Sequence, residues 1–276
     1  MAKMGTVWDR TAEFLSDNLP AVVPVALLAF FVPASISGSF QGMRQSAGPG
    51  LVLTLSLVQL AFAVLSVWGS VTITAMALDM ADGRSAGSIG RARLIPALVV
   101  ALVLFAAMVL LVLPVPLVLQ ANGYDMMAIA RGENVPSQAM LGGISLYLLA
   151  LLLLLLWIGA RLFVTTPVIV REKRMLSALR QSWKLTRGMT WRIVGVILLF
   201  CMVSWVSILA ANMVFGSIFA LVAGGPADGI SLASVLTSIV VAAVQSGFTL
   251  LVPAFTAKLY LALTAEAGLR EGVLAA

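Results

Sequence analysis

The sequence contains no histidine and a single cysteine, Cys201. Without histidine the chain lacks the commonest general base and most transition-metal sites, and one cysteine excludes an intrachain disulfide. The GxxxxGK[ST], HExxH, CxxC and GxSxG motifs of phosphate binding, metal binding, redox chemistry and nucleophilic catalysis are also missing. We therefore expect no catalytic activity, no cofactor and no metal.

Charge is scarce as well. Charged residues make up 10% of the chain, whereas about 25% is usual in soluble domains. Hydrophobic residues reach 61%, with a mean hydropathy of +1.09. A water-soluble fold of this composition would expose large apolar patches, so we place the chain in a bilayer. The net charge of +6 is then explained by loops that face anionic lipid, and no nucleic-acid partner is expected.

Six apolar segments are long enough to cross a bilayer, which requires about 20 residues. The sequence thus predicts an all-α, polytopic membrane protein with six transmembrane helices and additional interfacial amphipathic helices. The predicted spans are residues 19–40, 51–80, 94–119, 143–170, 193–222 and 235–263, within a membrane domain at 19–264. Pro20, Pro24 and Pro33 predict a kink in the first span.

The two ends of the chain are predicted to lie outside the bilayer core. In residues 1–18, Val7, Thr11 and Phe14 recur at helical spacing with acidic residues on the other side. This pattern predicts an interfacial helix and does not resemble a cleavable signal peptide. Residues 265–276 form a short tail.

The basic residues predict the orientation. If both termini are cytoplasmic, 14 of the 17 Lys and Arg residues lie at the inner side, Arg44 and Arg131 lie outside, and Arg161 lies within a span. Positive residues favour cytoplasmic loops. We expect a multi-pass protein of the bacterial inner membrane with both termini in the cytoplasm.

Residues 171–192 hold seven of those basic residues between two apolar runs. Wound as one helix, the segment gathers four cations on one stripe beside an apolar stripe that includes Leu176 and Trp183. The cations of the stripe are Lys173, Arg180, Lys184 and Arg187. A general topology anchor is the favoured interpretation, and a specific phospholipid-headgroup site is the sharper one.

Arg161 is the one basic residue well within a predicted span, and a charge there must snorkel or find a partner. It would either contact an anionic headgroup or phosphate in a cavity, or form a buried contact. The buried partners we consider are Asp79, Glu172 and backbone carbonyls freed near Pro167. Arg161 and Glu172 join the four stripe cations as candidates for headgroup contact.

Three amides, Gln59, Asn212 and Gln245, lie within the second, fifth and sixth spans. They either line a polar pathway or link helices by hydrogen bonds, and the second interpretation is favoured. The series Ser66, Ser70, Thr74 predicts a close helix contact.

The cytoplasmic side also shows a weak repeat. Residues 82–92 align without gaps on residues 172–182, and each copy follows an even-numbered span. This alignment suggests three hairpin-like units.

The fourth span and the loop after it resemble a known family. The carrying residues are Arg161, Pro167 to Glu172, Ser177-Ala-Leu-Arg180, Ser182-Trp183, Leu185-Thr186, Gly188 and Trp191-Arg192. This order is similar to the membrane domain of glycerophosphoryl diester phosphodiesterases and related six-span bacterial proteins. Some relatives fuse that domain to a soluble phosphodiesterase barrel, whose histidines and carboxylates this chain lacks.

The resemblance implies a membrane partner of lipid or glycerophosphodiester metabolism without hydrolytic activity. We expect the protein to bind or position phospholipid, with anionic lipid at the cytoplasmic face, or to serve as the membrane subunit of a lipid-related enzyme. The alternative is a small transporter or permease with a polar site at mid-membrane, supported by the broken first span, Arg161 and the repeat.

Overall fold

The structure is a computed structural model that describes residues 4–45, 48–80, 83–134, 136–223 and 232–274. All regular structure in these residues is helical. Six helical segments in this part of the chain are long and apolar enough to cross a membrane, which confirms the predicted fold class. They are Met4–Gly38, Gly50–Ala77, Ser85–Ala121, Gln138–Glu172, Thr190–Val222 and Leu232–Gly268.

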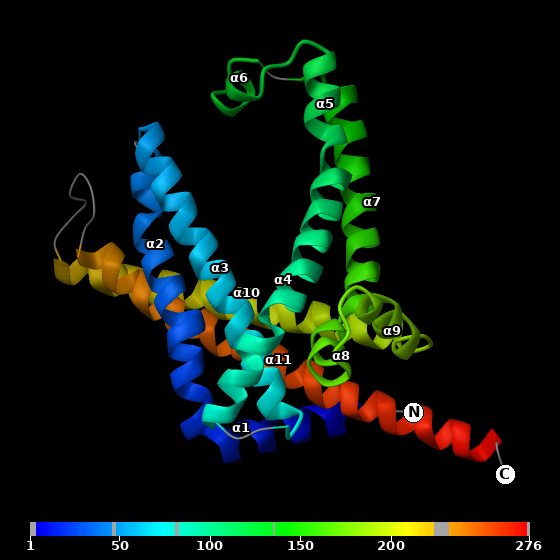
Figure 1. The fold of residues 1–276 in the computed structure, drawn as a ribbon. Coiled ribbons are helices and arrows are strands. Elements are labelled where there is room, and N and C mark those ends of the chain that lie inside the picture. The colour runs from blue at the N-terminus through cyan, green and yellow to red at the C-terminus, as the bar shows by residue number, and fades with distance from the viewer. Residues whose placement is uncertain (1–3, 46–47, 81–82, 135, 224–231, 275–276) are drawn as a thin grey trace.

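The long helices form three hairpins that splay from a common end (Figure 1). The first pairs α2 (Val32–Gln45) with α3 (Pro49–Ala77). The second pairs α4 (Gly83–Val112) and α5 (Pro114–Ala121) with α7 (Gln138–Leu162), and a short helix, α6 (Met126–Ala130), lies at its tip. The third pairs α10 (Thr190–Ala223) with α11 (Leu232–Leu274).

We call the common end the base. It gathers α1 (Met4–Ala26), α8 (Thr165–Glu172) and α9 (Ser177–Leu185) near the turn between α3 and α4 (Figure 1). The three hairpins match the units suggested by the weak repeat, although Asp82, the acid of its first copy, lies outside the described residues. The basic segment of residues 171–192 lies at the base, whereas Arg131 lies at a tip.

The first helical segment is irregular where the prolines predict a kink. Pro20 and Pro24 lie inside α1, which is followed by a π-helix, η1 (Leu27–Phe31), before α2 begins. A proline lacks the backbone N–H of a regular helical turn, and π-turns often adjoin functional sites. The Ser66 hydroxyl on α3 donates a hydrogen bond to the Ala29 carbonyl at 2.9 Å. The irregular turn is therefore held from a neighbouring helix.

The N-terminal helix α1 has the predicted apolar side, and this side packs against other helices of the protein. Val7, Thr11 and Phe14 are all buried, and α1 lies against α11. The Trp8 and Phe255 rings lie 4.6 Å apart between their centroids. Helix α1 thus closes one side of the base.

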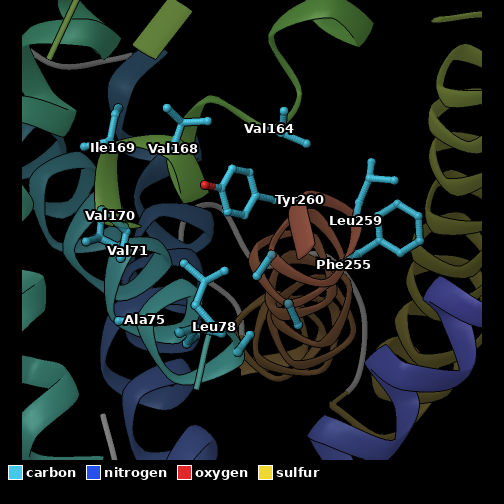
Figure 2. Packing of buried hydrophobic residues seen from close by; sticks show 14 of the residues in the cluster. Val71, Ala75, Leu78, Val164, Val168, Ile169, Val170, Phe255, Leu259 and Tyr260 are labelled. Carbon is cyan, nitrogen blue, oxygen red and sulfur yellow. The ribbon is translucent and has the colours of Figure 1, made fainter. Parts of the chain in front are cut away.

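The core is concentrated at the base. Residues 71–78, at the end of α3 and its C-cap, are all buried, and they pack near Val168 and Val170 of α8 and Tyr260 of α11 (Figure 2). By contrast, residues 101–110 of α4 are all exposed, as lipid-facing apolar residues should be. The hairpins therefore pack closely against one another at the base, and their side chains are exposed along much of the rest of their length.

Residues 171–192 do not form the single helix that we predicted. Helix α8 ends at Glu172, because Lys173 adopts a left-handed conformation with φ of 57°. Helix α9 then spans Ser177–Leu185, and Gly188, with φ of 92°, lies in the turn before α10. Lys173 is therefore not on the same helical stripe as Arg180 and Lys184.

Candidate functional site

Arg161, near the end of α7, lies against two tryptophan rings that also contact each other. Its guanidinium carbon lies 5.4 Å from the Trp157 ring centroid and 5.1 Å from that of Trp183 on α9. The two rings meet edge to face at 5.2 Å. Arginine over an aromatic face gains about 0.5–2 kcal/mol, and more when desolvated. Of the alternatives considered for Arg161, the buried pair with Asp79 or Glu172 is wrong, because these two carboxylates pair with Lys258 and Arg174 and the guanidinium lies on the aromatic rings.

The backbone of Arg161 is fixed by the same helix, α9. The Ser182 hydroxyl donates to the Arg161 carbonyl at 2.9 Å, and the Thr186 hydroxyl lies 3.1 Å from it. In return Arg161 Nη1 donates to the Trp183 carbonyl at 3.3 Å. Carbonyls in the last turn of a helix lack intrahelical partners, and in a membrane they must find others. We call Trp157, Arg161, Ser182, Trp183 and Thr186 the α7–α9 lock.

The lock explains which face of α9 is buried. Ala178, Ser182 and Thr186 are fully buried, whereas Leu176 is 49% exposed and Trp183 37% exposed. The predicted apolar stripe, which also includes Leu179 and Thr186, is therefore buried only in part: Leu179 packs against the core and Thr186 is fully buried. The face that carries the Ser182 and Thr186 hydroxyls contacts the end of α7.

Glu172 is also tied within the protein. Its Oε1 accepts a hydrogen bond from the Tyr260 hydroxyl at 3.0 Å, and its Oε2 lies 2.9 Å from Arg174 Nε. Arg171 Nη1 lies 3.5 Å from the Leu78 carbonyl at the end of α3. Glu172 therefore joins α8 to α11, and it is less available to a ligand than the exposed cations nearby.

Asp79 has a different partner. Its Oδ1 lies 3.6 Å from Lys258 Nζ, and this ammonium also lies 5.0 Å from the centroid of the Phe14 ring. These contacts join α1, α11 and the turn after α3. Asp79 therefore helps to hold the helices of the base together.

The four stripe cations remain at the surface. Lys173, Arg180, Lys184 and Arg187 are exposed, and none forms an ion pair with another described residue. Arg180 and Lys184 are four residues apart on α9, so they share a face of that helix. Lys173 and Arg187 lie in the turns at its two ends. The result is a short, firmly seated segment with four uncompensated positive charges.

A second site gathers the three amides. A pocket of about 940 Å³ lies among η1, α2, α3, α10 and α11, and Gln59, Asn212 and Gln245 all line it. Within the described residues, none of these three side chains makes a hydrogen bond to another group. The favoured interpretation, amides that link helices, is therefore wrong. Arg161 does not line this pocket.

The predicted small-residue contact is confirmed beside the pocket. A Cβ added at Gly69 would lie 2.3 Å from Ala29 Cβ, and Ser66 bonds to the same turn. Sequence reasoning did not single out Gly69, although its position between Ser66 and Ser70 was the available signal.

No three His, Cys, Asp or Glu side chains gather as a metal-binding group in the part of the chain that the structure describes.

Part of the chain resembles a known protein family. Residues 139–273 match the family model of the membrane domain of glycerophosphoryl diester phosphodiesterase. This part of the chain is similar to that family.

Comparison with curated proteins and with solved structures gave no match. The glycerophosphoryl diester phosphodiesterase membrane domain, as matched here, begins at the start of α7 and extends through most of α11. It contains the whole α7–α9 lock and the four stripe cations. Asn212 and Gln245 of the pocket also lie within it, whereas Gln59 precedes it.

Proposed function

We propose that this protein is a non-catalytic membrane subunit that binds anionic phospholipid headgroups at its base. The observation that carries the proposal is the arrangement of Lys173, Arg180, Lys184 and Arg187. All four are exposed and unpaired within the described residues, on a segment that the α7–α9 lock seats against α7.

The seating of the segment distinguishes this arrangement from an ordinary basic loop. Ordering the backbone of a flexible loop on binding costs about 1–2 kcal/mol per residue. The lock fixes the backbone of α9 beforehand through Ser182 and Arg161. Part of that ordering cost is thus met by the fold, which favours a defined headgroup contact.

The charge bias supports a cytoplasmic location for the base. The segment of residues 171–192 lies there, and Arg131 at a tip forms an ion pair with Glu133 at 3.4 Å. Positive residues favour the cytoplasmic side, and anionic lipid in that leaflet attracts each with about 1 kcal/mol near the surface.

The test uses the full chain in nanodiscs of mixed phosphatidylglycerol and phosphatidylcholine. Native mass spectrometry measures the ratio of the two lipids retained by the released protein. Replacing the four stripe cations by glutamine should lower phosphatidylglycerol enrichment by roughly tenfold or more. An unchanged ratio in a variant that elutes and melts like the wild type contradicts the proposal.

The family supports a second part of the proposal, a partner enzyme of lipid or glycerophosphodiester metabolism. The matched domain is named after such a phosphodiesterase. Co-expression with a soluble glycerophosphodiester phosphodiesterase domain, followed by size-exclusion chromatography in detergent, tests the association. Separate elution at micromolar concentrations of both proteins contradicts it.

A small permease is the second candidate, because the pocket brings three intramembrane amides together. Transport requires that this site open to both sides of the membrane. Accessibility of a cysteine at Gln245 to impermeant reagents from each side, in the Cys201→Ala background, tests the alternative. Reaction from one side alone favours the non-transporting subunit.

A further inference from the structure

The three amides that line the pocket lie far from the nearer ends of their helices. Gln59 is ten residues from the start of α3, Asn212 eleven from the end of α10 and Gln245 thirteen from the start of α11. At 1.5 Å per residue these positions lie about 15–20 Å from the tips. Three amides on different helices therefore reach a common depth within the hydrocarbon region.

Three hydroxyls of the pocket on α11 donate their protons to backbone carbonyls of the same helix. Thr237 donates to the Ala233 carbonyl at 2.8 Å, and Thr249 to the Gln245 carbonyl at 2.8 Å. Ser246 makes a similar bond, to the Ala242 carbonyl at 2.5 Å. Such hydroxyls keep lone pairs that accept hydrogen bonds but have no proton left to give.

The amides complement these hydroxyls. Each carboxamide offers two N–H donors and one carbonyl acceptor, and those of Gln59, Asn212 and Gln245 are unused among the described residues. Polar groups that stay unpaired in a membrane cost free energy. A ligand that both donates and accepts hydrogen bonds would satisfy amides and hydroxyls together.

The lining also limits the charge of the ligand. No Lys, Arg, Asp or Glu is among the described residues that line the pocket. A phosphate or carboxylate here would be a charge at membrane depth without a counter-ion, which is unfavourable. Phe30, Phe62 and Val241 add apolar wall. The chemistry that fits is an uncharged group with several hydroxyls.

The end of the pocket at Phe30 is closely packed. Phe30 belongs to the π-helix η1, whose Ala29 carbonyl accepts the Ser66 hydroxyl bond. Ala29 also lies against Gly69, where an added Cβ would be only 2.3 Å away. The irregular turn is therefore held by close contact with α3, and it shapes one end of the site.

We propose that this pocket binds an uncharged polyol group, presented either as a lipid headgroup or as a free polyol. This inference is independent of anionic lipid binding at the base, because it concerns different residues and an uncharged ligand. The amides would donate to and accept from the polyol hydroxyls, and the serine and threonine oxygens would accept from them.

The lipid arm of the test uses the full chain in nanodiscs that contain phosphatidylcholine and monoglucosyl diacylglycerol with the same acyl chains. Native mass spectrometry measures retention of each lipid. We expect the wild type to enrich the glucolipid. The triple variant Gln59→Leu, Asn212→Leu, Gln245→Leu should lose this enrichment by roughly tenfold, since each good hydrogen bond contributes about 1 kcal/mol.

The free arm measures thermal unfolding in detergent with glucose in large excess. A sugar stabilises most proteins by exclusion from their surface, so the wild-type shift is compared with that of the triple variant. A larger shift in the wild type indicates binding to the native state. Glucolipid enrichment identifies a lipid as the source, and a glucose shift without enrichment identifies a free polyol.

Three further variants make the test specific. Ala63→Trp fills the pocket from α3 and should abolish binding with all three amides in place. Asn122→Leu removes an amide at the end of α5, outside the pocket, and should have no effect. Gln245→Leu alone serves if the triple variant does not fold. The proposal is overturned if neither arm shows binding, or if binding is lost in Ala63→Trp but kept in the amide variant.

Discussion

Arg161 shows how a charge can be kept near the end of a transmembrane helix without an acidic partner. Its guanidinium lies over the rings of both Trp157 and Trp183, and its backbone carbonyl accepts a hydrogen bond from the Ser182 hydroxyl. The planar guanidinium suits this position, because it stacks on rings and still donates to the Trp183 carbonyl.

The first residue-scale prediction concerns that stacking. Arg161→Lys keeps the charge but loses the planar contact, so we expect destabilisation by about 1–2 kcal/mol. Reversible unfolding in mixed detergent, followed by circular dichroism, measures it. Arg131→Lys is the matched control, because Arg131 lies at a tip and pairs only with a nearby acid among the described residues. Equal effects of the two changes would contradict the role given to the rings.

A second residue-scale prediction concerns the Arg161 carbonyl. Ser182→Ala removes its nearer hydroxyl donor, and Thr186→Val the second. Because Thr186 can take over when Ser182 is lost, the double variant should cost more than the sum of the singles, by about 0.5–2 kcal/mol. Thr186→Ser keeps the hydroxyl and should be nearly neutral. A double-mutant cycle without coupling would show that the two hydroxyls act separately.

At the scale of elements, the prediction from sequence succeeded where a pattern lies within one helix. Six spans, the buried side of the N-terminal helix and the kink near Pro24 all follow from local spacing and proline chemistry. The division of residues 171–192 was missed. Gly188, with its positive φ, was a visible signal for the second break, but Lys173 in a left-handed conformation gave none.

Contacts between residues that are far apart in the sequence were not predicted. Trp157 and Trp183 are 26 positions apart and meet only because α9 folds back on α7. Likewise, Gln59, Asn212 and Gln245 share a pocket because two hairpins adjoin, and spacing within one span cannot reveal this. The residues themselves were identifiable, whereas their mutual arrangement depended on the tertiary fold.

One element-scale prediction uses the close contacts of α3. Gly90→Ala would place a Cβ 2.1 Å from Thr72 Oγ1, and Gly69→Ala 2.3 Å from Ala29 Cβ. Both should destabilise the protein by about 1–3 kcal/mol through overpacking. Gly87→Ala, where the nearest atom is Trp68 Cζ2 at 3.7 Å, should be neutral or slightly stabilising. Unfolding in detergent measures the free energy of unfolding of the three variants. A Gly69→Ala protein as stable as the wild type would contradict the close contact between α3 and η1.

At the scale of the whole molecule, charge separates the base from the tips. We predict that the base faces the cytoplasm. In the Cys201→Ala background, Ser177→Cys at the base should react with an impermeant maleimide only after cells are permeabilised. Asn122→Cys near a tip should react in intact cells, since both residues are exposed. The reverse labelling pattern would invert the proposed topology.

The central claim is that Arg180 and Lys184, whose helix α9 is held in place by the α7–α9 lock, bind anionic headgroups more strongly than an ordinary basic residue at the surface does. The direct measurement compares two matched pairs in phosphatidylglycerol and phosphatidylcholine nanodiscs by native mass spectrometry. Arg180→Gln with Lys184→Gln should lower phosphatidylglycerol enrichment roughly tenfold. Arg91→Gln with Arg93→Gln removes the same charge from α4, outside the locked segment, and should change it much less. Equal losses in the two variants would reduce the segment to a topology anchor and contradict the account.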